Sequence, residues 1–242
     1  MSDSCENGMN SPAKAVWQFR NLGRLDWDTA AREQERVADA IARGECPGTV
    51  LFVEHNPVYT YGLRFRPENF RRRFDPTEAT YCGVPVRRAF RGGELTYHGP
   101  GQLVAYPILR LPQRAGDLRQ LVAFYGDVVI ASLNELGIAG FVRADAIGVW
   151  TERGKIASIG VGLRRGVTRN GFAVNVAVDR QPFDLIVPCG LTEPIANVAD
   201  FTHSRISIDD VRVLIQKYSI RLGNRWLEGK ELPECGKKEG SL

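Results

Sequence analysis

Apolar side chains recur every three to four residues in three stretches of the chain, a period that predicts amphipathic helices. The first stretch covers 26–43 and is followed by Gly44, a common residue at a helix end. The second, 117–136, carries the broadest apolar stripe and precedes Gly137. The third covers 207–222 and begins with a serine three residues before an aspartate, a spacing typical of a helix start.

Eight shorter runs are rich in valine, isoleucine and aromatic residues and are bounded by glycine or proline, so they are predicted strands. They cover 15–20, 49–54, 58–61, 85–88, 102–109, 147–151, 155–164 and 171–178. Strands and helices do not alternate strictly, which disfavours a doubly wound parallel sheet. The order predicts an α+β fold, with helices packed on one face of a mixed, largely antiparallel sheet.

No internal repeat and no long glycine-, serine- or proline-rich linker interrupts these elements. A single domain is therefore expected over 15–225. The flanking segments, 1–14 and 226–242, are polar and are predicted to be tails without fixed structure.

Composition narrows the class of protein. The 242 residues include 32 lysines and arginines and 28 aspartates and glutamates, and the resulting charge of +4 is too small for a dedicated nucleic-acid binder. No run of about 18 apolar residues predicts a membrane span, and the first residues lack the apolar stretch of a secretory signal. A cytoplasmic protein is expected, with neither a nucleic acid nor a membrane as its partner.

The five cysteines, at positions 5, 46, 82, 189 and 235, are odd in number, scattered, and free of any CxxC pair. This pattern disfavours a zinc site or a disulfide framework, and no metal is expected. Cysteines are most often small buried hydrophobes. Cys189 differs because it lies between Pro188 and Gly190 in a predicted turn, where a thiol beside a cation would be a competent nucleophile. By composition alone this is still the less common interpretation.

The segment 91–107, RGGELTYHGPGQLVAYP, has the highest density of glycine and polar side chains. Glycines let a backbone approach a ligand closely, which favours a binding loop. A tight hairpin, with turns at 92–93 and 99–101, explains the same pattern equally well. The segment matches neither a phosphate-binding Walker loop nor a dinucleotide fingerprint.

Lys155 follows a turn and begins an otherwise apolar predicted strand, KIASIGVGL. A lysine in that position is most often a solvated strand end. The small residues Ser158 and Gly160 on this strand, and Gly171 and Ala173 on the next, would leave room for a ligand to lie against both strands.

Taken together, the segments RGGELTYHGPGQLVAYP, GKIASIGVGLRRGVTRNGFAVNV and PCG, with EHNPVYTYG at 54–62, resemble the octanoyltransferases of protein lipoylation, also called lipoyl(octanoyl) transferases. Their order and spacing fit over about 15–222. The resemblance implies a biotin/lipoate protein ligase-like fold, in agreement with the α+β expectation, and makes 15–225 the catalytic domain.

The resemblance also implies an activity. Members of the family transfer an octanoyl group from acyl carrier protein to one lysine of a lipoyl domain, the first step of endogenous lipoate attachment. The implied acyl-thioester intermediate forms on Cys189, and Lys155 favours the thiolate and takes part in proton transfer. Exchange between a thiol and a thioester is nearly balanced in energy, so neither ATP nor a cofactor is expected.

The resemblance further implies the substrate-binding residues and the partners. Lipoyl domains of 2-oxoacid dehydrogenases and the glycine cleavage H protein are the implied acceptors, and a monomer is expected. His98 is expected to order the site or to contact the acyl carbonyl rather than to act as the base. The residues expected to line the acyl channel are Arg91, Gly92, Gly93, Glu94, Leu95, Thr96, Tyr97, His98, Ser158, Ile159, Gly160, Gly171, Phe172 and Ala173.

Two departures from the family pattern stand out. Asn170 replaces a histidine that family members usually carry before Gly171, and asparagine cannot carry a proton. The residues after Cys189, GLTEPIANVADF, also differ from the expected continuation. Neither departure changes Cys189 or Lys155.

An arginine-rich stretch offers a surface for acidic partners such as carrier proteins and lipoyl domains. A solvated basic loop is the more common explanation of such a stretch. It contains Arg64, Arg66, Arg71, Arg72, Arg73, Arg87, Arg88 and Arg91.

Three other functions compete with octanoyl transfer from a carrier protein. An ATP-dependent lipoate–protein ligase shares the fold but carries a different motif in place of 88–102. An amidotransferase would move the octanoyl group between two protein lysines. A non-catalytic carrier-protein binding module would bind without forming an adduct on Cys189.

Overall fold

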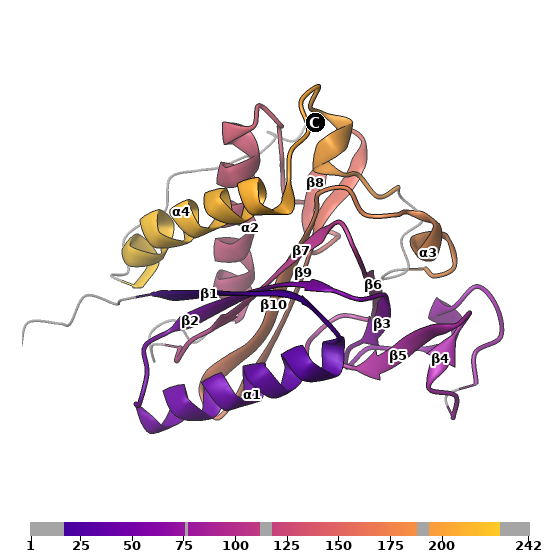
Figure 1. The fold of residues 1–242 in the computed structure, drawn as a ribbon, viewed down its shortest axis with the longest axis horizontal. Coiled ribbons are helices and arrows are strands. Elements are labelled where there is room, and N and C mark those ends of the chain that lie inside the picture. Colours follow the sequence, from indigo (N-terminus) through magenta and orange to yellow (C-terminus); the bar gives the residue numbers. More distant parts are fainter. Residues whose placement is uncertain (1–16, 76, 112–117, 188–193, 228–242) are drawn as a thin grey trace, which may run out of the picture.

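The computed structural model describes residues 17–75, 77–111, 118–187 and 194–227. These residues form one six-stranded and one four-stranded sheet with helices against them (Figure 1). Both predicted tails lie almost wholly outside this range, as does Cys189.

The large sheet has the strand order β1-β2-β7-β10-β9-β8, and only β1 and β2 are parallel. The predicted mixed, largely antiparallel sheet is therefore confirmed. Its strands are β1 (Gln18–Leu25), β2 (Thr49–His55), β7 (Gln102–Ile108), β8 (Val149–Thr151), β9 (Gly154–Arg164) and β10 (Val167–Asn175).

Helices cover both faces of the large sheet, so the expectation that they pack on one face is wrong. α1 (Trp27–Arg43) lies on one face, and α2 (Leu118–Glu135) and α4 (Ile208–Leu227) lie on the other (Figure 1). The alternation within β2 accounts for this arrangement, because Leu51 and Val53 pack toward α1 while Val50 and Phe52 pack toward α2. A strand that is buried on both faces has a continuous apolar sequence without alternation. Such a sequence does not show that helices cover both sides of the sheet.

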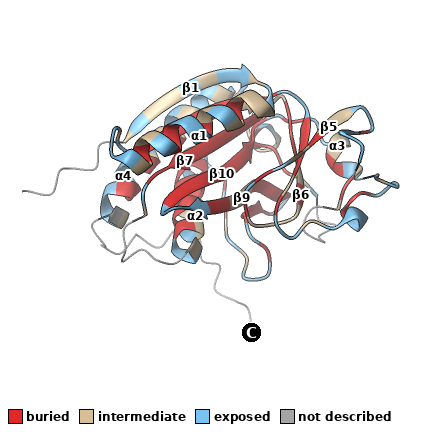
Figure 2. Ribbon diagram, turned by 90° about the horizontal axis from the view of Figure 1, so that it is seen from below, coloured by how far each residue is buried: buried red, intermediate tan, exposed pale blue. Residues whose placement is uncertain are grey.

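α1 begins and ends where its sequence predicts. The Asp26 side chain accepts a hydrogen bond from the Thr29 N–H, and Gly44 adopts a left-handed conformation beyond the last turn. Its inner face is buried, while its outer face is exposed (Figure 2). The helix covers only part of the sheet, because its contacts lie chiefly with β1, β2, β7 and β10.

The small sheet has the order β4-β5-β3-β6. Its strands are β3 (Val58–Tyr61), β4 (Thr80–Tyr81), β5 (Val84–Arg88) and β6 (Leu95–His98), and the short helix α3 (Gln181–Asp184) lies nearby. Aromatic rings hold these elements together: the centroids of Tyr59 and Tyr97 are 5.4 Å apart, and those of Tyr97 and Phe183 are 5.3 Å apart.

The predicted strand at 58–61 is confirmed, whereas β4, β6 and α3 were not anticipated. The hairpin interpretation of 91–107 is also wrong. β6 pairs with β3 in the small sheet, while β7 pairs with β2 and β10 in the large one. The turn 99–101 therefore carries the chain from one sheet to the other.

Candidate active site

A cavity of about 560 Å³ lies against β9 and β10, and its lining includes Trp27 of α1 as well as Leu118 and Val122 of α2. It exists because the strand register brings small residues together. Val104, Ala173 and Ser158 are cross-strand neighbours on β7, β10 and β9, and Gly171 pairs with Gly160 in a neighbouring row. These short side chains leave a hollow where α1 no longer covers the sheet.

The segment 91–98 closes the cavity opposite these strands, with Arg91, Gly92, Gly93, Leu95, Thr96 and His98 in its lining. Its backbone wraps around Gly62: the N–H groups of residues 62, 63 and 64 donate to the carbonyls of Glu94, Arg91 and Gly93. A side chain at Gly62 would meet three of the loop's carbonyl oxygens at 2.6–2.8 Å, so only glycine fits there.

Arg91 holds this segment in place from within. Its guanidinium donates to the Thr60 carbonyl at 2.7 Å, to the Thr60 hydroxyl at 3.0 Å and to the Gly92 carbonyl at 3.0 Å. The Gly92 N–H donates in turn to the Val161 carbonyl on β9, beyond the part of β9 that pairs with β8. The 91–98 segment is thereby joined to both sheets.

Lys155 lies at the start of β9 and is only 8% exposed, so the solvated strand end considered for it is wrong. Its ammonium lies 5.3 Å from the centroid of the Trp150 ring, a cation–π contact. The preceding Gly154 has φ of 126°, and a side chain there would collide with the Pro194 carbonyl. The glycine thus lets the segment from Pro194 onward pack directly against the lysine backbone.

Cys189 belongs to 188–193, outside the described residues, but the residues on both sides of that segment are held by backbone hydrogen bonds. Before it, the Val187 N–H donates to the Asn69 carbonyl at 2.7 Å. After it, the Pro194 carbonyl accepts the Lys155 N–H at 2.9 Å, and the Ala196 N–H donates to the Lys155 carbonyl. Pro194 therefore lies five residues along the chain from Cys189 and in direct contact with Lys155.

Two buried histidines meet beside the cavity, with ring centroids 5.8 Å apart. Burial lowers the pKa of His98 to about 3 and that of His55 to about 4, so both rings are neutral at physiological pH. His55 Nδ1 lies 3.3 Å from the Leu25 carbonyl, so it carries the proton and Nε2 accepts from the Tyr106 hydroxyl at 2.7 Å.

Most of the residues expected along the acyl channel line this one cavity, together with Lys155. Two of them, Glu94 and Tyr97, do not. Glu94 accepts a hydrogen bond from Asn69 at 2.9 Å, and Tyr97 is buried in the aromatic cluster of the small sheet. Because side chains alternate along β6, Tyr97 turns away where Thr96 and His98 turn inward.

The sequence reasoning missed several apolar lining residues, namely Trp27, Val104, Tyr106, Leu118, Val122 and Ile147. Leu118 and Val122 lie within the second predicted helix, 117–136, whose apolar stripe was not linked to the site. Their spacing was visible, but nothing in it distinguishes a wall of a cavity from a packed core.

Asn170 also lines the cavity, and its conformation explains why asparagine suits the position. Its φ is +58°, a left-handed value that asparagine tolerates well. Its side-chain amide donates to the Phe90 carbonyl at 2.7 Å, and its backbone N–H donates to Gln34 Oε1 at 3.0 Å. Asn170 therefore fixes the start of the 91–98 segment.

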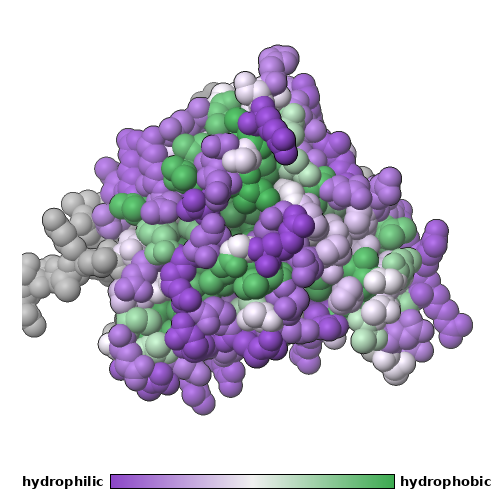
Figure 3. Space-filling model, in the orientation of Figure 1, coloured by the Kyte–Doolittle hydropathy of each residue, from purple (hydrophilic) through white to green (hydrophobic). Residues whose placement is uncertain are grey.

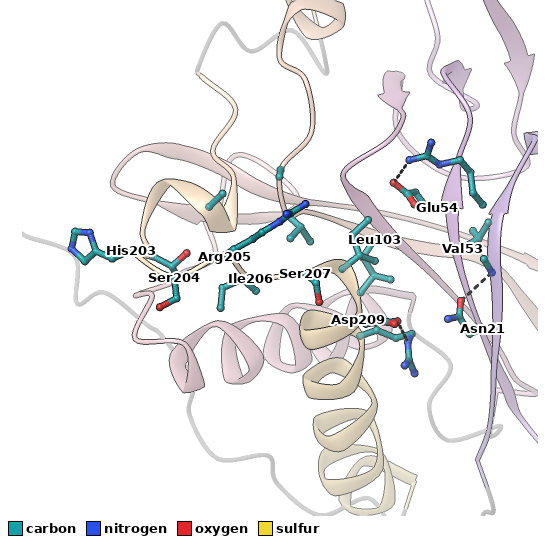
Figure 4. Close-up of a pocket in the computed structure, with 18 residues that line it drawn as sticks. Asn21, Val53, Glu54, Leu103, His203, Ser204, Arg205, Ile206, Ser207 and Asp209 are labelled. Atoms are coloured by element: carbon teal, nitrogen blue, oxygen red, sulfur yellow. Dashed lines mark hydrogen bonds and ion pairs between the residues drawn. The ribbon is translucent and has the colours of Figure 1, made fainter.

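A second hollow of about 710 Å³ lies on the α4 face, between the end of β2 and the segment that leads into α4 (Figure 4). Arg205 extends across it from that segment (Figure 4). Glu54 at its edge pairs with Arg24 at 2.8 Å and accepts the Gly101 N–H at 2.8 Å. Glu54 thus secures the turn between the sheets, and this hollow contains neither Lys155 nor any cysteine among its described lining residues.

Comparison with known proteins places this fold and cavity in a class. The model of the lipoyl protein ligase A/B catalytic domain matches residues 27–219. A bipartite lipoate protein ligase from Thermoplasma acidophilum, solved in a study with its E2 lipoyl domain, superposes with a TM-score of 0.63 at 19% identity, covering 92% of this chain and 87% of that one. At that identity the likeness concerns the fold alone.

Sequence relatives define the branch within the class. The octanoyltransferase of Pelobacter propionicus is 38% identical over 86% of this chain and 96% of its own length. The octanoyltransferase of Syntrophotalea carbinolica is 39% identical over 87% of this chain and 96% of its own length. The chain belongs to the octanoyltransferase family.

Proposed function

We propose that this protein transfers an octanoyl group from acyl carrier protein to a lysine of lipoyl domains, through a thioester on Cys189. The observation that carries the proposal is the position of Lys155. It is a buried cation at an apolar cavity, and its backbone is bonded to the segment that follows the family's cysteine motif.

The proposed chemistry has two steps. The Cys189 thiolate attacks the carrier-protein thioester, the carrier thiol leaves, and the octanoyl chain occupies the cavity. The lysine amine of the lipoyl domain then attacks the new thioester, an amide forms, and the Cys189 sulfur leaves as a thiolate that takes up the released proton. Lys155 stabilises the thiolate in both steps through its positive charge.

Octanoyl transfer is favoured over two of the three alternatives named from the sequence, the ATP-dependent ligase and the non-catalytic binding module. The relatives that match at 38–39% identity are octanoyltransferases, whereas the ligases match at 19%. A non-catalytic binding module would have no need of a buried lysine beside the cysteine segment.

The direct test is intact-mass spectrometry of the protein after incubation with octanoyl carrier protein and no ATP. One octanoyl group is expected on a peptide containing Cys189. A lipoyl domain added afterwards should remove it and gain the same mass. A requirement for ATP would support the ligase instead, and tight binding without any adduct would support the binding module.

The length of acyl chain that the protein transfers should depend on the side chains that form the floor of the cavity. Ser158→Leu replaces a hydroxyl by a branched group with two more heavy atoms in the space proposed for the octanoyl chain, so transfer of octanoyl should fall by about 100-fold or more. Transfer of butanoyl from the same carrier should fall by less than about fivefold. Ser158→Ala is the matched control and should behave as wild type with both donors. If Ser158→Leu slowed octanoyl and butanoyl transfer equally, the acyl chain would not lie against Ser158.

The partner surface is proposed at the rim of the cavity. Leu63 is 63% exposed and Phe90 is 49% exposed, and the exposed Arg66 and Arg88 lie close to them in sequence. Arg87, by contrast, pairs with Asp28, and Arg91 is buried in the site. Apolar anchors flanked by cations suit the acidic surface of a carrier protein or a lipoyl domain.

Charge reversal tests this surface. The double variant Arg66→Glu with Arg88→Glu should raise the KM for octanoyl carrier protein about tenfold at low salt, and much less at high salt. The rate with octanoyl-pantetheine, which has no protein surface, should not change. Arg221→Glu, on the exposed side of α4, is the control. Equal losses with both donors would argue against a docking role.

We also propose a cytoplasmic location. Cys46 and the exposed Cys82 are free thiols, and a catalytic thiolate needs reducing surroundings. Among the described residues, no helix is long and apolar enough to cross a bilayer. On the face drawn in Figure 3, hydrophobic groups gather mainly in the middle of the molecule, within a largely hydrophilic surface.

A further inference from the structure

A buried chain of polar side chains joins the cavity to the backbone of Lys155. His98 Nδ1 lies 2.7 Å from Gln102 Oε1, Gln102 Nε2 donates to Asn175 Oδ1 at 2.8 Å, and Asn175 Nδ2 donates to the carbonyls of Lys155 and Ala196 at 3.3 and 3.2 Å. Gln102 and Asn175 are 2% and 4% exposed.

The donors and acceptors in this chain can be assigned without ambiguity. The carbonyls of Lys155 and Ala196 can only accept, so the amide nitrogen of Asn175 faces them and its oxygen faces Gln102. That oxygen can only accept a hydrogen bond, so the amide nitrogen of Gln102, which donates it, faces Asn175. The oxygen of Gln102 is then left for His98, and His98 Nδ1 must carry the hydrogen.

The other nitrogen of His98 is consequently an acceptor. A neutral imidazole carries a single N–H, and burial keeps this ring neutral. Nε2 has no hydrogen-bond partner among the described residues, and His98 lines the cavity. An acceptor nitrogen cannot bond to the oxygen of an acyl carbonyl, which is itself an acceptor, so the carbonyl contact expected from the sequence does not fit this tautomer.

The second step brings a donor to that nitrogen. A Cys189 thiolate has no proton, and the thioester has none to donate. The attacking amine of the lipoyl-domain lysine has two N–H bonds when it is neutral. We propose that Gln102 and Asn175 are positioning residues that hold His98 as a hydrogen-bond acceptor for this amine, which aims the nitrogen lone pair at the thioester carbon.

The inference rests on the proposed function and concerns its second step alone. The amine forms the C–N bond, the C–S bond breaks, and the proton of the amine passes to the departing Cys189 sulfur. His98 keeps its own proton on Nδ1 throughout and does not serve as the base. Asn175 also bonds to the Lys155 carbonyl, so the chain ends on the lysine strand, whose backbone is held independently by its bonds to Pro194 and Ala196.

Nitrogen-15 NMR of the wild-type protein gives the first test, and it requires no substrate. The His98 signals should show a proton on Nδ1 and none on Nε2 from pH 5 to 8. A proton on Nε2 would overturn the proposal, whatever the protein's activity proves to be.

Kinetics of the separate half-reactions gives the second test. Gln102→Leu should leave octanoylation of Cys189 within about threefold of wild type and slow transfer to a lipoyl domain by about 30- to 100-fold. His98→Phe should slow transfer to the lipoyl domain to the same extent, and for that step the double variant should be no slower than His98→Phe, because Gln102 acts through the ring. Equal slowing of both half-reactions, or additive losses, would contradict the proposal. Absence of any acyl-enzyme in wild type would instead refute the proposed function.

Discussion

Replacing Cys189 with alanine is expected to abolish octanoyl transfer, by about 10⁴-fold or more, and to remove the octanoyl adduct from the protein. The reason is chemical: without the thiol no acyl-enzyme can form, and the carrier-bound chain has no route to the lipoyl domain. Intact mass after incubation with octanoyl carrier protein, followed by transfer to a lipoyl domain, measures both losses.

Cys82→Ala is the matched control for this experiment. Cys82 is an exposed free thiol on the small sheet, so its loss should change neither the adduct nor the rate. Cys189→Ser adds a further check, since a serine ester would be a slow, trapped form of the same intermediate. Normal turnover of the Cys189→Ala variant would exclude the thioester mechanism altogether.

Replacing Lys155 with methionine is expected to slow octanoylation of Cys189 by about 10²- to 10³-fold at pH 7. Methionine keeps most of the buried volume against Trp150 and removes the charge. An ordinary thiol loses its proton only near pH 8.5, so without a neighbouring cation the thiolate fraction is small at neutral pH. The rate of the variant should therefore rise about tenfold per pH unit between pH 6.5 and 8.5.

The pH profile separates an electrostatic role from a structural one. If the substitution disrupted the site, octanoylation would be slow at every pH. If it removed only the charge, a higher pH would restore part of the rate by raising the thiolate fraction. Lys217→Met is the control, because Lys217 pairs with Glu135 on the outer side of the helices and should matter only for that contact. A variant that remains equally slow at pH 8.5 and pH 6.5 would contradict the proposed role of Lys155.

Local sequence patterns predicted the elements that bury a single face or end at a clear signal. Asp26 and Gly44 define α1 because capping is a local property. The same reasoning failed for β6, whose partner β3 lies more than thirty residues earlier, because glycine density describes a bend and not the strand that it leads to. The sequence also did not predict helices on both faces of the large sheet, because an apolar run does not show whether a strand is buried on one face or on two.

Recognition of the site came from motif resemblance, while its geometry required the structure. Lys155 looked like a strand end until its burial beside Trp150 was known. Glu94 belongs to the same motif as Arg91, yet it turns toward Asn69 and out of the cavity lining. The motif specifies which residues occur together, but only the folded structure shows which of their side chains reach the cavity.

The anchors of the cysteine-bearing segment have a mechanical consequence. Val187 is bonded to Asn69 beside the small sheet, and Pro194 is bonded to Lys155 on the large sheet, so the two residues that flank this segment are held by different sheets. A shift of one sheet against the other would change the distance between these two anchors without unfolding either sheet. The hydrogen bond from the Gly92 N–H to the Val161 carbonyl joins the 91–98 segment to the large sheet and opposes such a shift. Substitutions that loosen or tighten the contact between the two sheets therefore change the geometry of the site from a distance, without touching a reacting atom.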